Sequence, residues 1–173
     1  MDRPILILVH PGSLCGSANC NLGASEARAT RDGVATTLQS WNGDVLVLVG
    51  DLCDELGSYP QFQKAIDAAL ARSHATGGRG LAIYAPDPDH PEIALKQLNE
   101  WGVVAGAPLR LTGAWFDPTD ASGCINSTRE AIRSAGFNDV EVLDSAARLS
   151  PWDMEPDEVE PTPPRSRTTH NGR

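Results

Sequence analysis

The sequence predicts an α/β fold, a three-layer α/β/α sandwich around a five-stranded, mainly parallel, Rossmann-like sheet. Two observations favour this class. The first apolar run, Ile5–Val9, holds five consecutive aliphatic residues, which is typical of a strand buried on both faces. Strand-like and helix-like patterns then alternate along the chain without a tight hairpin signal. Such alternation indicates right-handed crossovers between parallel strands.

Each strand is predicted from a short apolar run. The second run, Val45–Val49, is as continuous as the first. The expected strands cover residues 5–9, 45–49, 81–85, 109–114 and 140–143.

Each helix is predicted from apolar residues at helical spacing and from its end signals. The first is expected over 24–41, with Asn42-Gly43 as its stop. The second begins near Tyr59-Pro60, since proline is tolerated in a first turn, and it ends before Gly77-Gly78. The third and fourth helices are expected over 92–104 and 125–135.

Five strands are too few for a closed eight-stranded barrel, and two open strand orders fit. In the order 3-2-1-4-5 the loops after the first and fourth strands are neighbours. In the flavodoxin-like order 2-1-3-4-5 the loop after the first strand lies beside the loop after the third. The apolar pattern does not choose between them.

Residues 1–150 are predicted to form one domain, and residues 151–173 an acidic, proline-rich tail. The tail has too few apolar residues to fold alone. Two interpretations stay open for it: a flexible end, or a segment that orders on a partner.

Composition restricts the partners of the chain. The 173 residues carry a net charge of −9, which argues against nucleic-acid binding because phosphates need a positive surface. No apolar stretch approaches the roughly 18 residues of a membrane span. The start of the chain lacks the pattern of a signal peptide, and we expect a cytoplasmic protein with free thiols. Homo-oligomerisation is compatible with this composition.

The loop after the first strand, His10 to Gly23, is a candidate anion site. Gly12, Ser13, Gly16 and Ser17 would present backbone N–H groups before a helix, an arrangement that binds phosphate or carboxylate. The spacing matches neither phosphate-binding glycine motif, P-loop or dinucleotide fingerprint. A turn without a ligand is the alternative. His10 is interpreted either as a base or ligand, or as a hydrogen-bonded structural histidine.

A second candidate lies between the fourth strand and the fourth helix. Cys124 begins that helix, where the helix N-terminus would lower the thiol pKa and favour the nucleophilic thiolate. A small buried residue at a helix start is the alternative. Trp115 would either stack on a ligand ring or pack beneath the loop.

The stretch Gly123-Cys124-Ile-Asn-Ser-Thr128, its following helix and a strand ending at Asp144-Ser-Ala146 resemble the final third of isochorismatase-like cysteine hydrolases. The resemblance implies the strand order 3-2-1-4-5 and Cys124 as nucleophile. It covers about 40 residues. The family's Asp after the first strand is replaced by His10, and its Lys after the third strand has no counterpart, so the family's triad is not transferred.

Acidic residues follow the second and third strands. Asp51 and Asp54 follow one strand, and Asp87, Asp89 and His90 follow the next. Carboxylates at neighbouring strand ends suit magnesium, and His90 would extend this to a transition metal. Ordinary solvated loops are the alternative. We assign no metal ligands and expect no cofactor.

The main functional hypothesis is a small-molecule hydrolase with Cys124 and His10 as catalytic residues. Its substrate would be a small anionic molecule held by Gly12, Ser13, Gly16, Ser17 and Trp115. The alternatives are a non-catalytic module that binds a nucleotide or another phosphorylated ligand, and an assembly protein that uses its tail. Whether the chain is an enzyme stays open at this point.

Overall fold

The computed structural model describes residues 3–15, 24–51, 53–118 and 122–146. Five strands form one sheet. They are β1 (Ile5–Val9), β2 (Asp44–Val49), β3 (Gly80–Tyr84), β4 (Leu109–Gly113) and β5 (Val140–Val142). All four strand pairs are parallel, which confirms the predicted α/β class. The predicted tail, 151–173, lies outside the described residues.

The strand order is β3-β2-β1-β4-β5, one of the two orders that the sequence left open. Ile7 of β1 pairs with Leu46 of β2 on one side and with Leu111 of β4 on the other. The chain therefore turns back across the sheet between β3 and β4. This places the end of β1 beside the end of β4, where open α/β sheets bind their ligands.

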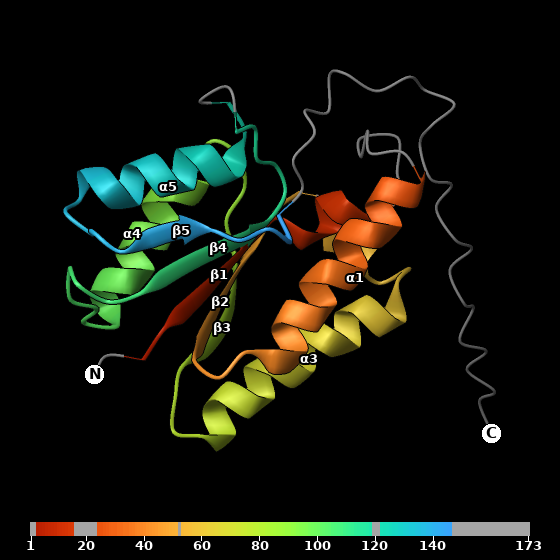
Figure 1. The fold of residues 1–173 in the computed structure, drawn as a ribbon, viewed down its shortest axis with the longest axis horizontal. Helices are drawn as coiled ribbons and strands as arrows, with labels where there is room; N and C mark the ends of the chain where they lie inside the picture. The colour runs from red at the N-terminus through yellow and green to blue at the C-terminus, as the bar shows by residue number, and fades with distance from the viewer. Residues whose placement is uncertain (1–2, 16–23, 52, 119–121, 147–173) are drawn as a thin grey trace, which may run out of the picture.

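Helices cover both faces of the sheet, so the molecule has three layers (Figure 1). The helices α1 and α3 lie on one face, and α4 and α5 lie on the other. The helical elements are η1 (Pro11–Leu14, a 3-10 turn), α1 (Ala24–Ser40), α2 (Cys53–Leu56), α3 (Pro60–Ala75), α4 (His90–Glu100) and α5 (Cys124–Ser134).

The alternation of side chains along β1 supplies both halves of the core. Leu6 and Leu8 pack under α1 and α3, while Ile5, Ile7 and Val9 pack under α4 and α5. All five are fully buried, as the unbroken apolar run predicts for a central parallel strand.

The observed helices differ from the predicted ones mainly at their ends. The helix expected over 92–104 is α4, which begins at His90, with Pro91 in its first turn, and ends at Glu100. Gly102 has a φ of 65°, a conformation that stops a helix and that glycine adopts without strain. The short elements η1 and α2 were not predicted, because four residues are too few to show a periodicity.

No helix among the described residues has both the length and the apolar character that a membrane crossing requires.

Candidate functional site

His10 stands at the end of β1 in a left-handed conformation, with φ 44° and ψ 58°. Its ring is 6% exposed and its Nε2 lies 2.8 Å from the carbonyl oxygen of Ala85 at the end of β3. A carbonyl only accepts, so Nε2 carries the proton. Burial lowers the pKa of His10 below its ordinary value, and the hydrogen bond to Ala85 opposes this shift. His10 is therefore a neutral, hydrogen-bonded histidine.

His90, in the first turn of α4, lies against His10. The two ring centroids are 4.8 Å apart, in an edge-on arrangement. The Nε2 of His90 is 3.1 Å from the carbonyl oxygen of Cys124, and its Nδ1 is 3.3 Å from an Asp87 carboxylate oxygen. Burial lowers the pKa of His90 as well, although the Cys124 carbonyl and Asp87 raise it. His90 thus connects β3, α4 and the start of α5.

Cys124 is the first residue of α5, as predicted, but its thiol is not activated. Burial raises its pKa to about 11, and the negative charge of Asp87 adds to this shift. Both effects outweigh the helix N-terminus, which favours the thiolate. The pKa of Cys124 therefore rises where the helix N-terminus alone predicts a fall, because the thiol is desolvated and has a carboxylate as its charged neighbour. A catalytic role for Cys124 stays a prediction.

Asp87, His90 and Cys124 form a compact set, which we call the Asp-His-Cys cluster. One ligand atom from each residue lies within 4.8 Å of the other two. His90 is 1% exposed, whereas the Asp87 side chain is 69% exposed. The cluster therefore extends from a buried imidazole ring to a carboxylate that solvent reaches. It gathers side chains that can bind a cation, and His10 lies behind it.

The residues predicted to bind an anion do not form one group in the described part of the structure. Gly12 is buried and Ser13 is half-buried within η1, where the Ser13 N–H donates to the His10 carbonyl at 3.0 Å. Gly16 and Ser17 lie outside the described residues. Trp115 is 9% exposed and packs into the core on the α1 and α3 face, which leaves little of its ring for stacking. Their role in binding stays a prediction.

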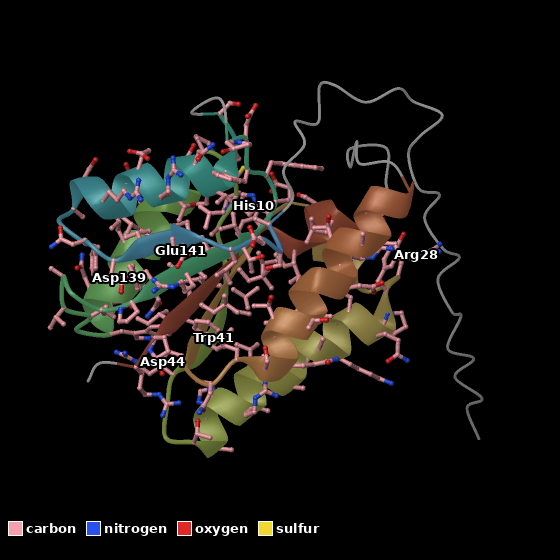
Figure 2. All side chains as sticks on the ribbon, in the orientation of Figure 1. His10, Arg28, Trp41, Asp44, Asp139 and Glu141 are labelled. Carbon is pink, nitrogen blue, oxygen red and sulfur yellow. The ribbon has the colours of Figure 1, made fainter. Side chains whose placement is uncertain are left out.

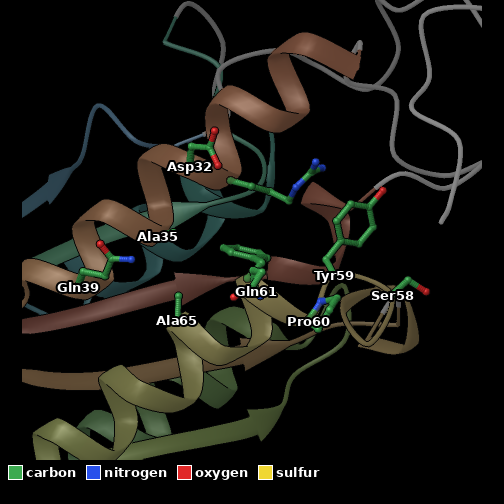
Figure 3. A pocket seen from close by; sticks show the side chains of 10 residues that line it. Asp32, Ala35, Gln39, Ser58, Tyr59, Pro60, Gln61 and Ala65 are labelled. Atoms are coloured by element: carbon green, nitrogen blue, oxygen red, sulfur yellow. The ribbon is translucent and has the colours of Figure 1, made fainter. Parts of the chain in front are cut away.

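A cavity of about 410 Å³ opens beside η1, between α1 and α3. Figure 3 shows Ala35 and Gln39 of α1 facing Gln61 and Ala65 of α3, with Tyr59 at one end. Arg31 also lines the cavity, donates to the Leu14 carbonyl at 2.8 Å and lies 4.3 Å from the centroid of the Tyr59 ring. The cavity combines apolar walls with a few polar groups, among them Arg31 and Asp32, which is the usual makeup of a small-molecule site.

Comparisons with known proteins give little further guidance. No family model and no curated protein matches the chain. One solved structure, a protein from the universal stress protein family from Burkholderia pseudomallei, is 13% identical, with 80% of this chain and 94% of that chain covered. Its TM-score is 0.34, too low to support an argument about function.

The resemblance to isochorismatase-like cysteine hydrolases is wrong, because no family model matches the chain. The physical reason is that the matched segment consists of a glycine, a helix start and a short strand, which any β-α-β unit can contain. The strand order that the resemblance implied is observed, but many open α/β sheets share it.

Sequence reasoning identified His90 only as one of several acidic-loop residues, and it missed the contact with Cys124. The two residues are 34 positions apart and follow strands that are not neighbours in the sheet. A partial signal existed, because His90 and Cys124 both begin helices that cover the same face. The α1–α3 cavity had no sequence signal, since half-buried alanines and glutamines also line ordinary helix contacts.

Proposed function

We propose that the chain is a non-catalytic α/β module that binds a small anionic molecule, with a nucleotide or a sugar phosphate as the ligand class. The cavity between α1 and α3 is the observation that carries this proposal. Its volume of about 410 Å³ falls in the range of roughly 300–1,000 Å³ that is typical of small-molecule sites. One of its lining residues, Arg31, donates to the carbonyl of Leu14 in η1, the first part of the loop that the glycine and serine pattern singled out.

Arg31 favours an anion as the ligand. The side chain is only 7% exposed, and its contacts with Leu14 and Tyr59 hold it at the cavity. A guanidinium stays charged at every physiological pH, and it binds carboxylate and phosphate in a defined geometry. Because the contacts fix the group before binding, less side-chain entropy is lost when a ligand arrives.

The described residues that line this cavity include no cysteine and no histidine, which favours binding over catalysis. The titratable side chains among the described residues that line it are Arg31, Asp32 and Tyr59. The thiol of Cys124 is half-buried, and desolvation raises its pKa to about 11, so it is protonated at neutral pH. We therefore expect no turnover of the bound molecule.

Filling the cavity tests the proposal. Ala65 faces the cavity from α3 (Figure 3), so Ala65→Phe would place a ring in the ligand's volume. A panel of nucleotides, sugar phosphates and small dicarboxylates would be screened by thermal unfolding and calorimetry. A ligand at a hundred times its Kd stabilises the wild type by about 2.7 kcal/mol, and Ala65→Phe should abolish this stabilisation.

The matched control is Ala68→Phe, the same change one turn along the same helix at an exposed position. It should retain full stabilisation by the ligand. The proposal fails if no compound in the panel changes the melting temperature. It also fails if Ala65→Phe binds as well as Ala68→Phe, or if the bound compound is converted to a product.

A further inference from the structure

The hydrogen-bonding arrangement of His90 contains a conflict. Its Nε2 faces the Cys124 carbonyl oxygen at 3.1 Å, and a carbonyl can only accept. The Nε2 atom must therefore hold the proton of a neutral ring, and Nδ1 then has a bare lone pair. That buried Nδ1 has no hydrogen-bond partner among the described residues. The atom facing it, an Asp87 oxygen at 3.3 Å, also only accepts when it is ionised.

Moving the proton does not resolve the conflict. With the proton on Nδ1, the 3.3 Å contact with Asp87 becomes attractive, but the lone pair of Nε2 then faces the Cys124 carbonyl. Placing a proton on both nitrogens satisfies both contacts, but a ring that is 1% exposed disfavours a positive charge unless it is well paired. Asp87 pairs with it weakly, because its side chain is 69% exposed and solvent screens the interaction.

A cation between Nδ1 and the Asp87 carboxylate removes the conflict. The proton would stay on Nε2, and the cation would bind the lone pair of His90 Nδ1 and a lone pair of the Asp87 carboxylate. The Cys124 sulfur supplies a third donor atom, since it, a ring nitrogen of His90 and an Asp87 oxygen lie within 4.8 Å of one another. In a tetrahedral zinc site the ligand atoms are about 3.3–3.8 Å apart, given metal–ligand bonds of about 2.0–2.3 Å. Small side-chain rotations would therefore close the cluster around one ion.

The donor types select the ion. A thiolate and an imidazole favour zinc and similar transition metals, whereas magnesium and calcium prefer an all-oxygen set. Three protein ligands with an open fourth position are typical of zinc sites that also bind water or a substrate atom. On binding, the thiol proton of Cys124 would leave to solvent as the zinc–sulfur bond forms.

The surroundings of His90 match those of a metal ligand. Histidine ligands usually donate their second N–H to a carbonyl or carboxylate, which fixes the ring and its tautomer. The contact from Nε2 to the Cys124 carbonyl has this form. Thr128 also donates to the same carbonyl, at 2.8 Å, so the backbone of the cysteine is held on both sides. The ring of His90 packs edge-on with the ring of His10, which limits its rotation.

We propose that Asp87, His90 and Cys124 form a mononuclear zinc site that opens to solvent at its fourth position. This proposal uses residues separate from the α1–α3 cavity and does not rest on anion binding there. The sequence alone assigned no metal ligands. The cluster supplies a nitrogen, a sulfur and an oxygen donor from the starts of two helices and the loop before them.

The test uses the untagged, full-length protein after treatment with a chelator. Cobalt(II) is titrated in as a spectroscopic substitute for zinc, and zinc binding is then measured by competition. We expect one cobalt per chain, the visible bands of a tetrahedral ion and a thiolate-to-cobalt charge-transfer band. Cys124→Ser should lose the charge-transfer band, and Asp87→Asn and His90→Asn should each weaken binding at least about 100-fold.

Asp89→Asn is the matched control, because it removes the same charge from an exposed position two residues away. It should bind cobalt like the wild type. Circular dichroism of each variant identifies any that does not fold, and Cys124→Ser keeps the size of the side chain for this reason. The proposal is overturned if the wild type binds no cobalt, or if folded Cys124→Ser retains the charge-transfer band. Cobalt binding by Ala65→Phe should equal the wild type, which separates this outcome from the fate of the anion site.

Discussion

Two polar clusters lie at opposite ends of the strands, and they differ in what their carboxylates contact. Figure 2 labels Asp44 at the amino end of β2 and His10 at the carboxyl end of β1. The Asp44 side chain is fully buried and its two carboxylate oxygens both have cationic partners. In the Asp-His-Cys cluster a lone pair of His90 instead faces an Asp87 carboxylate.

The pairing at Asp44 is the arrangement of a structural cluster. Nε of Arg79 donates to one oxygen at 2.6 Å, and its backbone N–H donates to the other at 3.0 Å. Nε of Arg3 lies 3.2 Å from the second oxygen. These contacts join the chain before β1 and the start of β3 to β2. A buried carboxylate with a cationic partner at each oxygen holds these elements together.

The Asp-His-Cys cluster lacks such compensation. Among the described residues, His90 is the partner recorded for Asp87, and no arginine or lysine pairs with it. Unpaired acceptors in a buried position are rare in folded proteins and call for an explanation such as an unseen ion. The comparison teaches that burial of polar groups alone does not locate a site. The two clusters differ in what faces each carboxylate: Asp44 faces two arginines, whereas Asp87 faces a histidine lone pair.

The largest expected effect is at the structural cluster. Asp44→Ala leaves the two arginines without their anion and empties a buried space, so we expect a loss of about 3 kcal/mol in the free energy of unfolding. This is the lower end of the range for breaking a buried pair, because Arg3 and Arg79 are 36% and 39% exposed. Urea unfolding would measure the loss.

Asp139→Ala is the control for that experiment. Asp139 pairs with Arg110 at 2.7 Å but is 47% exposed, and exposed pairs contribute about 0–1 kcal/mol. If the two variants lose the same stability, the structural assignment of Asp44 is incorrect.

A smaller effect concerns the Cys124 thiol in the metal-free protein. Its pKa is raised from 9.0 to about 11, so the thiolate fraction falls about a hundredfold at a fixed pH below both values. The more basic thiolate is also more nucleophilic, which recovers about tenfold. We expect iodoacetamide to alkylate Cys124 roughly tenfold more slowly in the folded chain than in urea, as measured by peptide mass spectrometry. Faster alkylation in the folded chain would instead indicate an activated nucleophile.

The fold was predictable from the sequence because its signals are local. A parallel strand that is buried on both faces must be apolar throughout, and Ile5–Val9 and Val45–Val49 show this directly. The start of α3 followed from Pro60, and its end from the glycines that follow. The strand order has no local signal, since each crossover length fits both orders. It depends on which face each helix covers, and that is decided by packing across the whole sheet.

The candidate site was predictable only in its location. The ends of β1 and β3 and the start of α5 were each identified, because residues after parallel strands gather at one edge of the sheet. The pairing of His90 with Cys124 was not, since both are isolated polar residues whose partners lie far along the chain. The pKa of Cys124 was expected to fall and instead rises. A helix start is visible in sequence, whereas burial and the approach of Asp87 are tertiary properties.

The smallest expected effect is on the stability of the metal-free protein when Asp87 is replaced. Removing the Asp44 carboxylate should lower the free energy of unfolding, whereas removing the Asp87 carboxylate should raise it. In the metal-free protein, Asp87→Asn replaces an acceptor with an amide that can donate to the bare Nδ1 of His90. A new hydrogen bond of this kind contributes about 0.5–1.5 kcal/mol, and we expect a gain near 0.5 kcal/mol because Asp87 is 69% exposed. The same variant should bind cobalt more weakly, because a neutral amide is a poorer ligand than a carboxylate. Urea unfolding with a chelator present measures the first change, and cobalt titration measures the second. A loss of stability without metal would mean that Asp87 already receives a proton from His90, and that the cluster, like Asp44, is a closed structural pair.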